Sequence, residues 1–254
     1  MSYRDAPPRI GTSGWSFGHW KDDFYAGVPQ RRWLEHAAAC FTGLELNATF
    51  RRSPEESTVI RWREQTPDGF AFSIKGHRYI THNKKLREVA DSVARLREDT
   101  EILGDRRSAV FWQLPPDLKR DDARLADFLD VLAEEWSDLP HAFEFRDPSW
   151  HRDATLNLLE EAGASNVISD AADWPRWDAV CGPLAYVRLH GHEETYVSAY
   201  GEKALATWVG RAWNWLAEGR QLHIYLDNDK SGAAPHDARL LMRRLKLEGC
   251  GEAA

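Results

Sequence analysis

The sequence predicts an α/β fold, a single (β/α)8 TIM-like barrel with a polar lumen at the C-terminal ends of the strands. Short segments of alternating polarity and longer amphipathic segments follow one another eight times in 254 residues, which is the count and size of such a barrel. Strands that alternate with helices pair in parallel. No linker or change of composition divides the chain, so we expect one domain over residues 1–254, with its core at about 9–248.

Strands and helices are expected in strict alternation along the chain. The expected strands are 9–13, 43–47, 70–75, 108–114, 141–146, 166–170, 185–190 and 221–227. The expected helices are 31–40, 55–65, 86–103, 121–136, 152–162, 202–217 and 236–246. The order Ser53-Pro54-Glu55-Glu56 is typical of a first helical turn, with Ser53 as the cap. No helix is expected between 170 and 185, because Pro175 and Pro183 interrupt that segment.

The strands alternate between apolar and polar residues, whereas parallel strands buried on both faces are nearly continuously apolar. Leu44 and Leu46 flank Glu45, for example, and Val187 and Leu189 flank Arg188. Successive side chains point to opposite faces of a strand. We therefore expect the apolar set to face the helices and the polar set to face the lumen. The polar residues gather at the C-terminal ends of the strands, where barrels of this kind build their active sites.

Eight ionisable residues are expected to converge in the lumen or at its mouth: Glu45, Lys75, Glu144, Arg146, Asp170, Arg188, His190 and Asp227. We interpret Glu45, Glu144 and His190 as catalytic groups that exchange protons. Lys75, Arg146 and Arg188 are expected to bind an anionic substrate, because arginine offers a planar fork to phosphate and lysine a point charge. The alternative interpretation is an ion-pair network that fixes the barrel without any turnover.

Four further residues complete the predicted substrate-binding set: Trp15, Asn47, Asp227 and Asn228. Trp15 directly follows the Gly11–Gly14 turn and is expected to stack on a ring of the substrate. That turn lacks the spacing of a Rossmann or P-loop phosphate site. Other aromatic residues after the strands, Trp174 and Tyr196 among them, are expected either to contact a ligand or to pack as a lid.

The composition, with 43% hydrophobic and 29% charged residues, is typical of a globular chain. No apolar run approaches the roughly 20 residues that span a bilayer, and the chain start lacks the apolar core of a signal peptide. The three cysteines, Cys40, Cys181 and Cys250, lie far apart, which favours a reducing compartment. We therefore expect a cytoplasmic protein that does not bind membranes. No cofactor is expected, and a divalent metal is kept as a lesser alternative because no metal-binding spacing occurs.

Seven motifs follow one another along nearly the whole chain. They are GTSGWSFGHW at 11–20, ELNATF at 45–50, IKGHRYITH at 74–82, WQLPP at 112–116, FEFRDPSW at 143–150, YVRLHG at 186–191 and LDNDKSGAAPHDA at 226–238. Together they resemble the YecE-like TIM-barrel family, known as domain of unknown function 72. The resemblance implies the same barrel, without an established activity. Two positions depart from the family pattern: Arg51, where tyrosine is frequent, and Asp227, where asparagine is usual.

Two functions fit these residues. The first, which we favour, is an enzyme (a hydrolase, lyase or isomerase) that uses carboxylate acid/base chemistry on an anionic, phosphate-bearing substrate such as a phosphosugar, nucleotide or nucleic acid. The second is a non-catalytic protein that binds a nucleic acid or another polyanion through Arg51, Arg52 and the basic segment 75–87. The net charge of −7 argues against a protein that coats nucleic acid over its whole surface. Nothing in the sequence singles out a protein partner.

Overall fold

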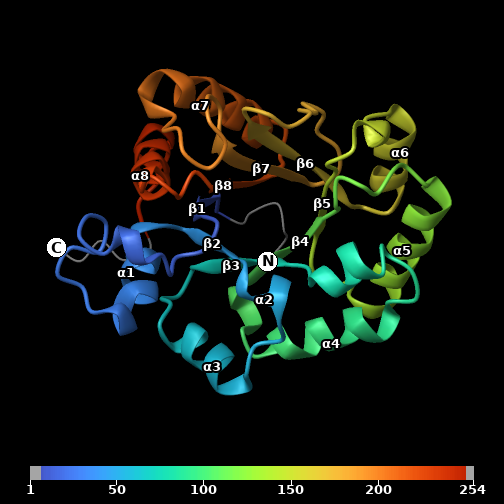
Figure 1. The fold of residues 1–254 in the computed structure, drawn as a ribbon, viewed down its shortest axis with the longest axis horizontal. Coiled ribbons are helices and arrows are strands. Elements are labelled where there is room, and N and C mark those ends of the chain that lie inside the picture. The colour runs from blue at the N-terminus through green and yellow to red at the C-terminus, as the bar shows by residue number, and fades with distance from the viewer. Residues whose placement is uncertain (1–6, 250–254) are drawn as a thin grey trace.

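Eight parallel strands form a nearly closed barrel in this computed structural model, which describes residues 7–249. The strands are β1 Arg9–Thr12, β2 Gly43–Leu46, β3 Ala71–Lys75, β4 Arg107–Gln113, β5 His141–Glu144, β6 Ser165–Ala171, β7 Leu184–Gly191 and β8 Gln221–Leu226. They pair in the order β1-β8-β7-β6-β5-β4-β3-β2. Helices surround the sheet (Figure 1). The predicted fold class and all eight predicted strands are confirmed, with strand ends that differ by one or two residues.

The seven predicted helices are all present. The α-helices are α1 Trp33–Cys40, α2 Ala48–Arg51, α3 Glu56–Glu64, α4 Ala90–Glu101, α5 Asp122–Glu135, α6 Asp153–Glu161, α7 Gly201–Ala217 and α8 Ala233–Leu245. Shorter turns are 3-10 helices at Gly18–Trp20, Gln30–Arg32, Gly104–Arg106 and Pro148–Trp150, and a π-helix at Tyr79–Asn83. The sequence analysis did not predict α2 or these turns. The segment between β6 and β7 contains no helix, as predicted.

Only some of the helices begin with a side chain that caps the first turn. Asp121 caps α5, because its side chain accepts a hydrogen bond from the backbone N–H of Arg124 at 3.1 Å. Ser53 does not cap α3, so that prediction is wrong. Glu55 occupies the N-cap position with an extended backbone (φ −65°, ψ 140°) and makes no capping hydrogen bond through its side chain. The helix therefore begins two residues after the place that a Ser53 cap would give it.

The barrel closes where β1 and β2 meet, at the two ends of the hydrogen-bonded strand order. A parallel bridge joins Ser13 to Glu45 there, and the Ile10 N–H donates to Thr42 Oγ1 at 2.8 Å. A Cβ atom on Gly11 would lie 1.9 Å from the carbonyl oxygen of Gly43. Only glycine allows this close approach of two backbones, so position 11 fixes how tightly the barrel closes.

The alternation of the strands divides the interior from the helix layer as predicted. The middle of the lumen is filled by Ala109, Phe111, Ala142, Val167, Leu184, Tyr186 and Tyr225. Tyr186 shares a hydrogen bond of 2.8 Å with Ser73 across the barrel. The lumen is therefore packed at this level, and the charged residues of the predicted site lie above it, toward the C-terminal ends of the strands. Over residues 7–249, no helix combines the length and apolar character that crossing a bilayer requires.

Candidate functional site

Arg188, on β7, is the centre of a buried group of charged residues. We call Glu45, Glu144, Arg188, His190 and Asp227 the inner network. Arg188 Nε donates to both carboxylate oxygens of Glu45 at 3.1 and 3.0 Å. Its Nη1 donates to Glu144 Oε2 at 3.0 Å, and its Nη2 donates to Asp227 Oδ2 at 2.9 Å. One guanidinium group thus binds three carboxylates that come from β2, β5 and the end of β8.

Two neutral groups use the remaining donors of Arg188. Nη1 donates to His190 Nε2 at 3.1 Å, and Nη2 donates to Ser13 Oγ at 3.0 Å. Ser13 Oγ also accepts a hydrogen bond from Asn47 Nδ2 at 2.8 Å. The five N–H groups of a guanidinium are thereby all satisfied within the protein. Arg188 therefore has no donor left for an anionic ligand, in contrast to the substrate-binding role that the sequence predicted.

The members of the inner network differ in proton affinity. Burial raises the pKa of Glu45, although Arg188 and Lys75 oppose this effect. Burial acts in the same sense on Glu144 and Asp227, but nearby cations outweigh it. Arg146 and Arg188 hold the pKa of Glu144 far below its usual value, and Arg188 contributes most to lowering the pKa of Asp227 to about 2. Glu144 and Asp227 are therefore ionised at neutral pH.

His190 is neutral at the same pH. Burial and the neighbouring Arg188 lower its pKa to about 4. Its Nε2 accepts from Arg188, and its Nδ1 lies 3.0 Å from Asp227 Oδ2. Both ring nitrogens thus face protein groups. Glu45, Glu144 and His190 are each 1% exposed or less, so the three predicted catalytic residues lie beneath the surface. Asp227, with its side chain 15% exposed, is the most accessible carboxylate of the inner network.

Lys75 ends β3 and is 9% exposed. Its Nζ lies 4.6 Å from the centre of the Phe50 ring and 5.5 Å from that of Phe111. Across the part of the chain that the structure describes, this Nζ has no hydrogen-bond or ion-pair partner. Burial, together with the positive charge of Arg188, lowers the pKa of Lys75 to about 8. Lys75 is therefore a desolvated amine held between aromatic rings.

Arg146 follows β5 and stacks on Trp174, with the guanidinium carbon 3.4 Å from the ring centre. Its Nε donates to Glu144 Oε1. Within residues 7–249 its two terminal nitrogens have no hydrogen-bond partner, and the side chain is 11% exposed. Arg146 and Lys75 thus keep donors that the described protein does not use. We call these two residues the open cations.

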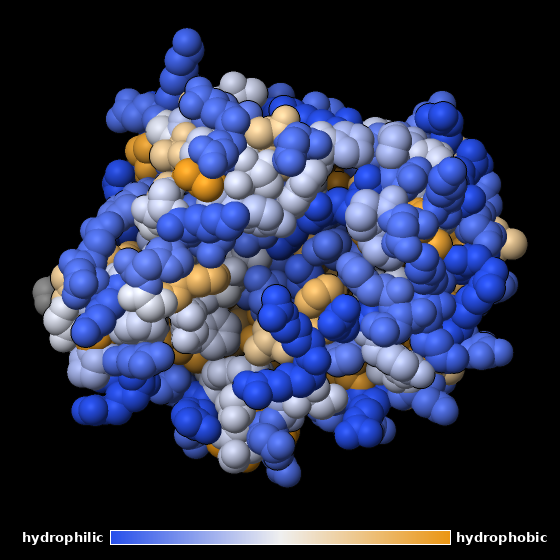
Figure 2. All heavy atoms as spheres, viewed as in Figure 1, coloured by the Kyte–Doolittle hydropathy of each residue, from blue (hydrophilic) through white to orange (hydrophobic). Residues whose placement is uncertain are grey.

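Trp174 and Tyr196 cover the inner network. The ring of Trp174 lies 4.4 Å from that of His190 and 5.6 Å from that of Tyr196. The sequence analysis placed both residues in loops above the strands but left them out of the predicted site. Figure 2 shows the face that carries α2, directly after the end of β2, and this face is hollowed near its centre with mostly hydrophilic residues around the hollow.

Three predicted residues are not brought to this site. The Trp15 ring packs at 5.8 Å from Trp62 and 6.0 Å from Phe72, on the helix side of the sheet. Asn228 is fully buried, and its amide donates to Ser198 O at 3.0 Å and to Asp237 Oδ2 at 2.8 Å, so it anchors the start of α8. Asp170 accepts from the hydroxyl of Tyr200 at 2.8 Å and pairs with Arg176 at 2.9 Å.

Two lysines of the basic segment 75–87 form ion pairs with the protein's own acids. Lys84 lies 3.4 Å from Glu88, and Lys85 lies 2.5 Å from Asp117. In the described range, no three His, Cys, Asp or Glu side chains are arranged to hold a metal ion. The carboxylates that could serve as ligands are turned toward Arg188 instead.

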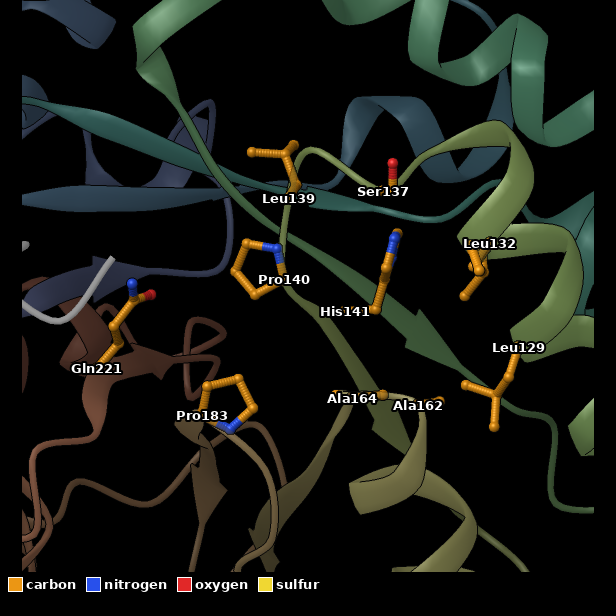
Figure 3. A pocket seen from close by; sticks show the side chains of 12 residues that line it. Leu129, Leu132, Ser137, Leu139, Pro140, His141, Ala162, Ala164, Pro183 and Gln221 are labelled. Carbon is orange, nitrogen blue, oxygen red and sulfur yellow. The ribbon is translucent and has the colours of Figure 1, made fainter. Parts of the chain in front are cut away.

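A separate cavity of about 310 Å³ lies at the opposite end of the barrel, where β5 to β8 begin (Figure 3). Leu129, Leu132 and Pro183 contribute apolar walls. His141 also lines it, but its Nε2 bonds to Trp136 O at 2.7 Å and its Nδ1 accepts from Trp112 Nε1 at 3.1 Å. Burial lowers the pKa of His141 to about 4. This cavity therefore offers no group that is poised for acid/base chemistry.

Comparison with known proteins assigns nearly the whole chain to one family. The family described as "Protein of unknown function DUF72" matches residues 9–253. UPF0759 protein YecE of Escherichia coli (strain K12) is 32% identical over 163 residues, a match that covers 58% of this chain and 59% of the relative. UPF0759 protein YunF of Bacillus subtilis (strain 168) is 21% identical and covers 95% of this chain and 96% of the relative.

Solved structures give the same result for the fold. A DUF72 family protein from Thermotoga maritima MSB8 has a TM-score of 0.83 at 25% identity, covering 94% of this chain and 98% of the other. A DUF72 family protein from Enterococcus faecalis V583 has a TM-score of 0.81 at 19% identity, covering 95% and 96%. These similarities support the barrel fold, and they indicate no activity or substrate.

Proposed function

Because this chain belongs to the DUF72 family, whose description names no activity, we propose from its own side chains that it is an enzyme acting on a small anionic, phosphate-bearing substrate. The open cations bind the anionic group. Arg146 offers two terminal nitrogens in a planar fork, and Lys75 adds a second positive charge. The reaction class is a hydrolase, lyase or isomerase that transfers protons through carboxylates of the inner network.

One observation carries this proposal: Lys75 is almost fully buried, yet its amine has no partner among the described residues. A largely desolvated charge without a direct partner costs free energy. Arg188, which is 1% exposed against 9% for Lys75, has three carboxylates as direct partners. Glu45, Asp227 and Glu144 act on Lys75 electrostatically without forming an ion pair with it, and an anionic ligand supplies a direct partner.

The carboxylates have different roles in this proposal. Glu144 and Asp227 are ionised, so they accept protons, whereas Glu45 holds a proton more readily because its pKa is raised. Glu144 lies directly behind Arg146, and Asp227 is the carboxylate with the greatest access to the hollow. A substrate held by Arg146 therefore has two ionised carboxylates close to its anionic end.

The test combines binding with turnover. Inorganic phosphate and glycerol 3-phosphate are titrated into the wild type and Arg146→Met by calorimetry, and we expect the substitution to weaken binding about tenfold, the loss of one charge-assisted hydrogen bond. Arg211→Met is the matched control, because Arg211 also stacks on a tryptophan and pairs with a carboxylate, Asp178 at 2.7 Å, but lies on α7.

For turnover, phosphosugars and nucleotides are screened for consumption by the wild type and by Glu144→Gln. Loss of a proton-transfer group lowers turnover by roughly 100-fold or more while phosphate binding persists. Equal phosphate affinity in the wild type and Arg146→Met would overturn the proposed anion site. Unchanged turnover in Glu144→Gln would remove the proton-transfer role. Binding of polyanions through the segment 75–87 is less well supported, since Lys84 and Lys85 are already paired.

A further inference from the structure

Lys75 differs from the neighbouring lysines in every respect that matters for nucleophilic attack. Lys84 and Lys85 have side chains 35% exposed and pair with acids. Lys75 is 9% exposed, faces the Phe50 and Phe111 rings and has no acid within ion-pair distance among residues 7–249. An amine reacts as a nucleophile only when it is unprotonated, and an apolar pocket or a neighbouring cation favours that state.

We propose that Lys75 forms a Schiff base with a carbonyl substrate whose anionic group is held by Arg146. This inference rests on the proposed function, and it narrows the substrate class to aldehydes or ketones that carry a phosphate or carboxylate. Arg146 stands beside Glu144, and the charge of Lys75 also acts on Glu144, so the two open cations border the same carboxylate. The proposed substrate therefore has to place its carbonyl group at Lys75 while Arg146 holds its anionic group.

The chemistry needs no oxidant or reductant. The nitrogen lone pair of Lys75 attacks the carbonyl carbon, a carbon–nitrogen bond forms, and the nitrogen proton passes to the carbonyl oxygen to give a carbinolamine. Uptake of one proton from solvent and loss of the hydroxyl group as water break the carbon–oxygen bond and leave an iminium ion. The iminium then withdraws electrons from the adjacent carbon, which allows a carbon–hydrogen or carbon–carbon bond to break.

The surroundings suit each stage. Phe50 and Phe111 present ring faces that stabilise a cation and keep water away from it. Glu144 and Asp227 are both ionised, so either one has a lone pair to accept the proton from the carbon next to the iminium. The pKa of Lys75, lowered to about 8, leaves roughly a quarter of the amines unprotonated at pH 7.5, against about one in a thousand for an ordinary lysine.

The test is reductive trapping on the intact protein. Wild type is incubated at pH 7.5 with pyruvate or dihydroxyacetone phosphate, reduced with cyanoborohydride, digested and mapped by mass spectrometry. We expect the reduced adduct on Lys75 at least tenfold above that on Lys84 or Lys85, which are the internal exposed controls. Lys75→Arg, which keeps the charge but forms no imine, removes the adduct from that peptide. Labelling at Lys84 or Lys85 equal to that at Lys75 overturns the proposal.

Trapping of hydroxyacetone, a neutral ketone, tests the Schiff base independently of the proposed anion site. Arg146→Met is expected to reduce trapping of dihydroxyacetone phosphate about tenfold more than trapping of hydroxyacetone, with Arg211→Met equal to the wild type for both. If Arg146→Met weakens phosphate binding but no adduct forms on Lys75, the Schiff base is wrong and the anion site stands. If the adduct forms on Lys75 without any dependence on Arg146, the anion site is wrong.

Discussion

Arg188 and Arg146 share one carboxylate, Glu144, but stand in opposite situations. Arg188 is buried, and its five N–H groups bind three carboxylates, a serine and a histidine. Arg146 has one nitrogen on Glu144, a tryptophan against its plane and two terminal nitrogens with no partner in the described chain. In the inner network a cation thus connects side chains from several strands, whereas the open cations have hydrogen-bond donors available for a ligand.

This difference shows how the role of a charged residue at the mouth of a barrel can be inferred. A count of cations near the strand ends assigns Lys75, Arg146 and Arg188 the same role, because all three side chains point the same way. Their partners separate them. A cation whose donors are all used is part of the scaffold. A desolvated cation with unused donors is a candidate contact for a ligand.

The largest expected effect comes from Arg188→Met. It leaves Glu45 and Asp227 without their paired cation and Glu144 with Arg146 alone, so the free energy of unfolding falls by about 3–5 kcal/mol, the usual result of breaking a buried pair. Urea unfolding followed by circular dichroism measures it. Arg211→Met, which removes a pair at the helix surface, is expected to cost less than about 1 kcal/mol. Equal losses in the two variants would show that Arg188 contributes no more than a surface residue.

The second effect is a pH dependence from Lys75. Its folded-state pKa of about 8 lies below the 10.5 of an ordinary lysine, so between these values the unfolded chain binds more protons than the folded one. The free energy of unfolding therefore rises with pH from about 8 to 10.5, by roughly 1–3 kcal/mol. Lys75→Met lacks this rise and is more stable than the wild type at pH 7. A difference between the two unfolding curves that stays constant with pH contradicts the prediction.

A smaller effect follows from Trp174→Ala. The tryptophan ring stacks on Arg146, and loss of a partly buried cation–π contact costs about 0.5–1 kcal/mol. Phosphate affinity is expected to fall two- to fivefold, less than in Arg146→Met, because the guanidinium remains but is no longer oriented. Calorimetry measures this ratio, with Trp208→Ala as the control for removing a ring that stacks on Arg211. An affinity loss of the same size in both variants would argue against orientation by Trp174.

The smallest effect is expected at the far end of the barrel. Ala133→Leu adds apolar volume beside the cavity lined by Leu129 and Leu132 and should change the free energy of unfolding by less than about 1 kcal/mol. Phosphate affinity should stay equal to that of the wild type, since the packed middle of the lumen lies between the two ends. A changed affinity would mean that the two ends communicate.

The sequence contained enough to predict the barrel and the convergence of its charged residues. Period-two alternation decides which face of a strand a side chain takes, and so Glu45, Glu144 and Arg188 were placed together correctly. Alternation no longer applies beyond the last paired residue of a strand. Trp15, in the loop after β1, turned toward the helices because Phe72 and Trp62 offer it an apolar surface there.

Other features depend on distances that no sequence pattern encodes. Asn228 follows Asp227 directly, but its amide donates to Asp237, nine residues further along in α8, and not to a group at the mouth. All the donors of Arg188 are satisfied, whereas the amine of Lys75 has no partner among the described residues. This difference depends on the positions of side chains on several strands.

The meeting of β1 with β2 completes the set of partners around Arg188. Ser13 belongs to the first strand's end and Glu45 to the second, and both contact Arg188, which lies far along the chain. A nascent or nicked molecule whose ring is still open has Arg188 without two of its partners. The joint between the first two strands is therefore also part of the scaffold that holds Arg188 in place.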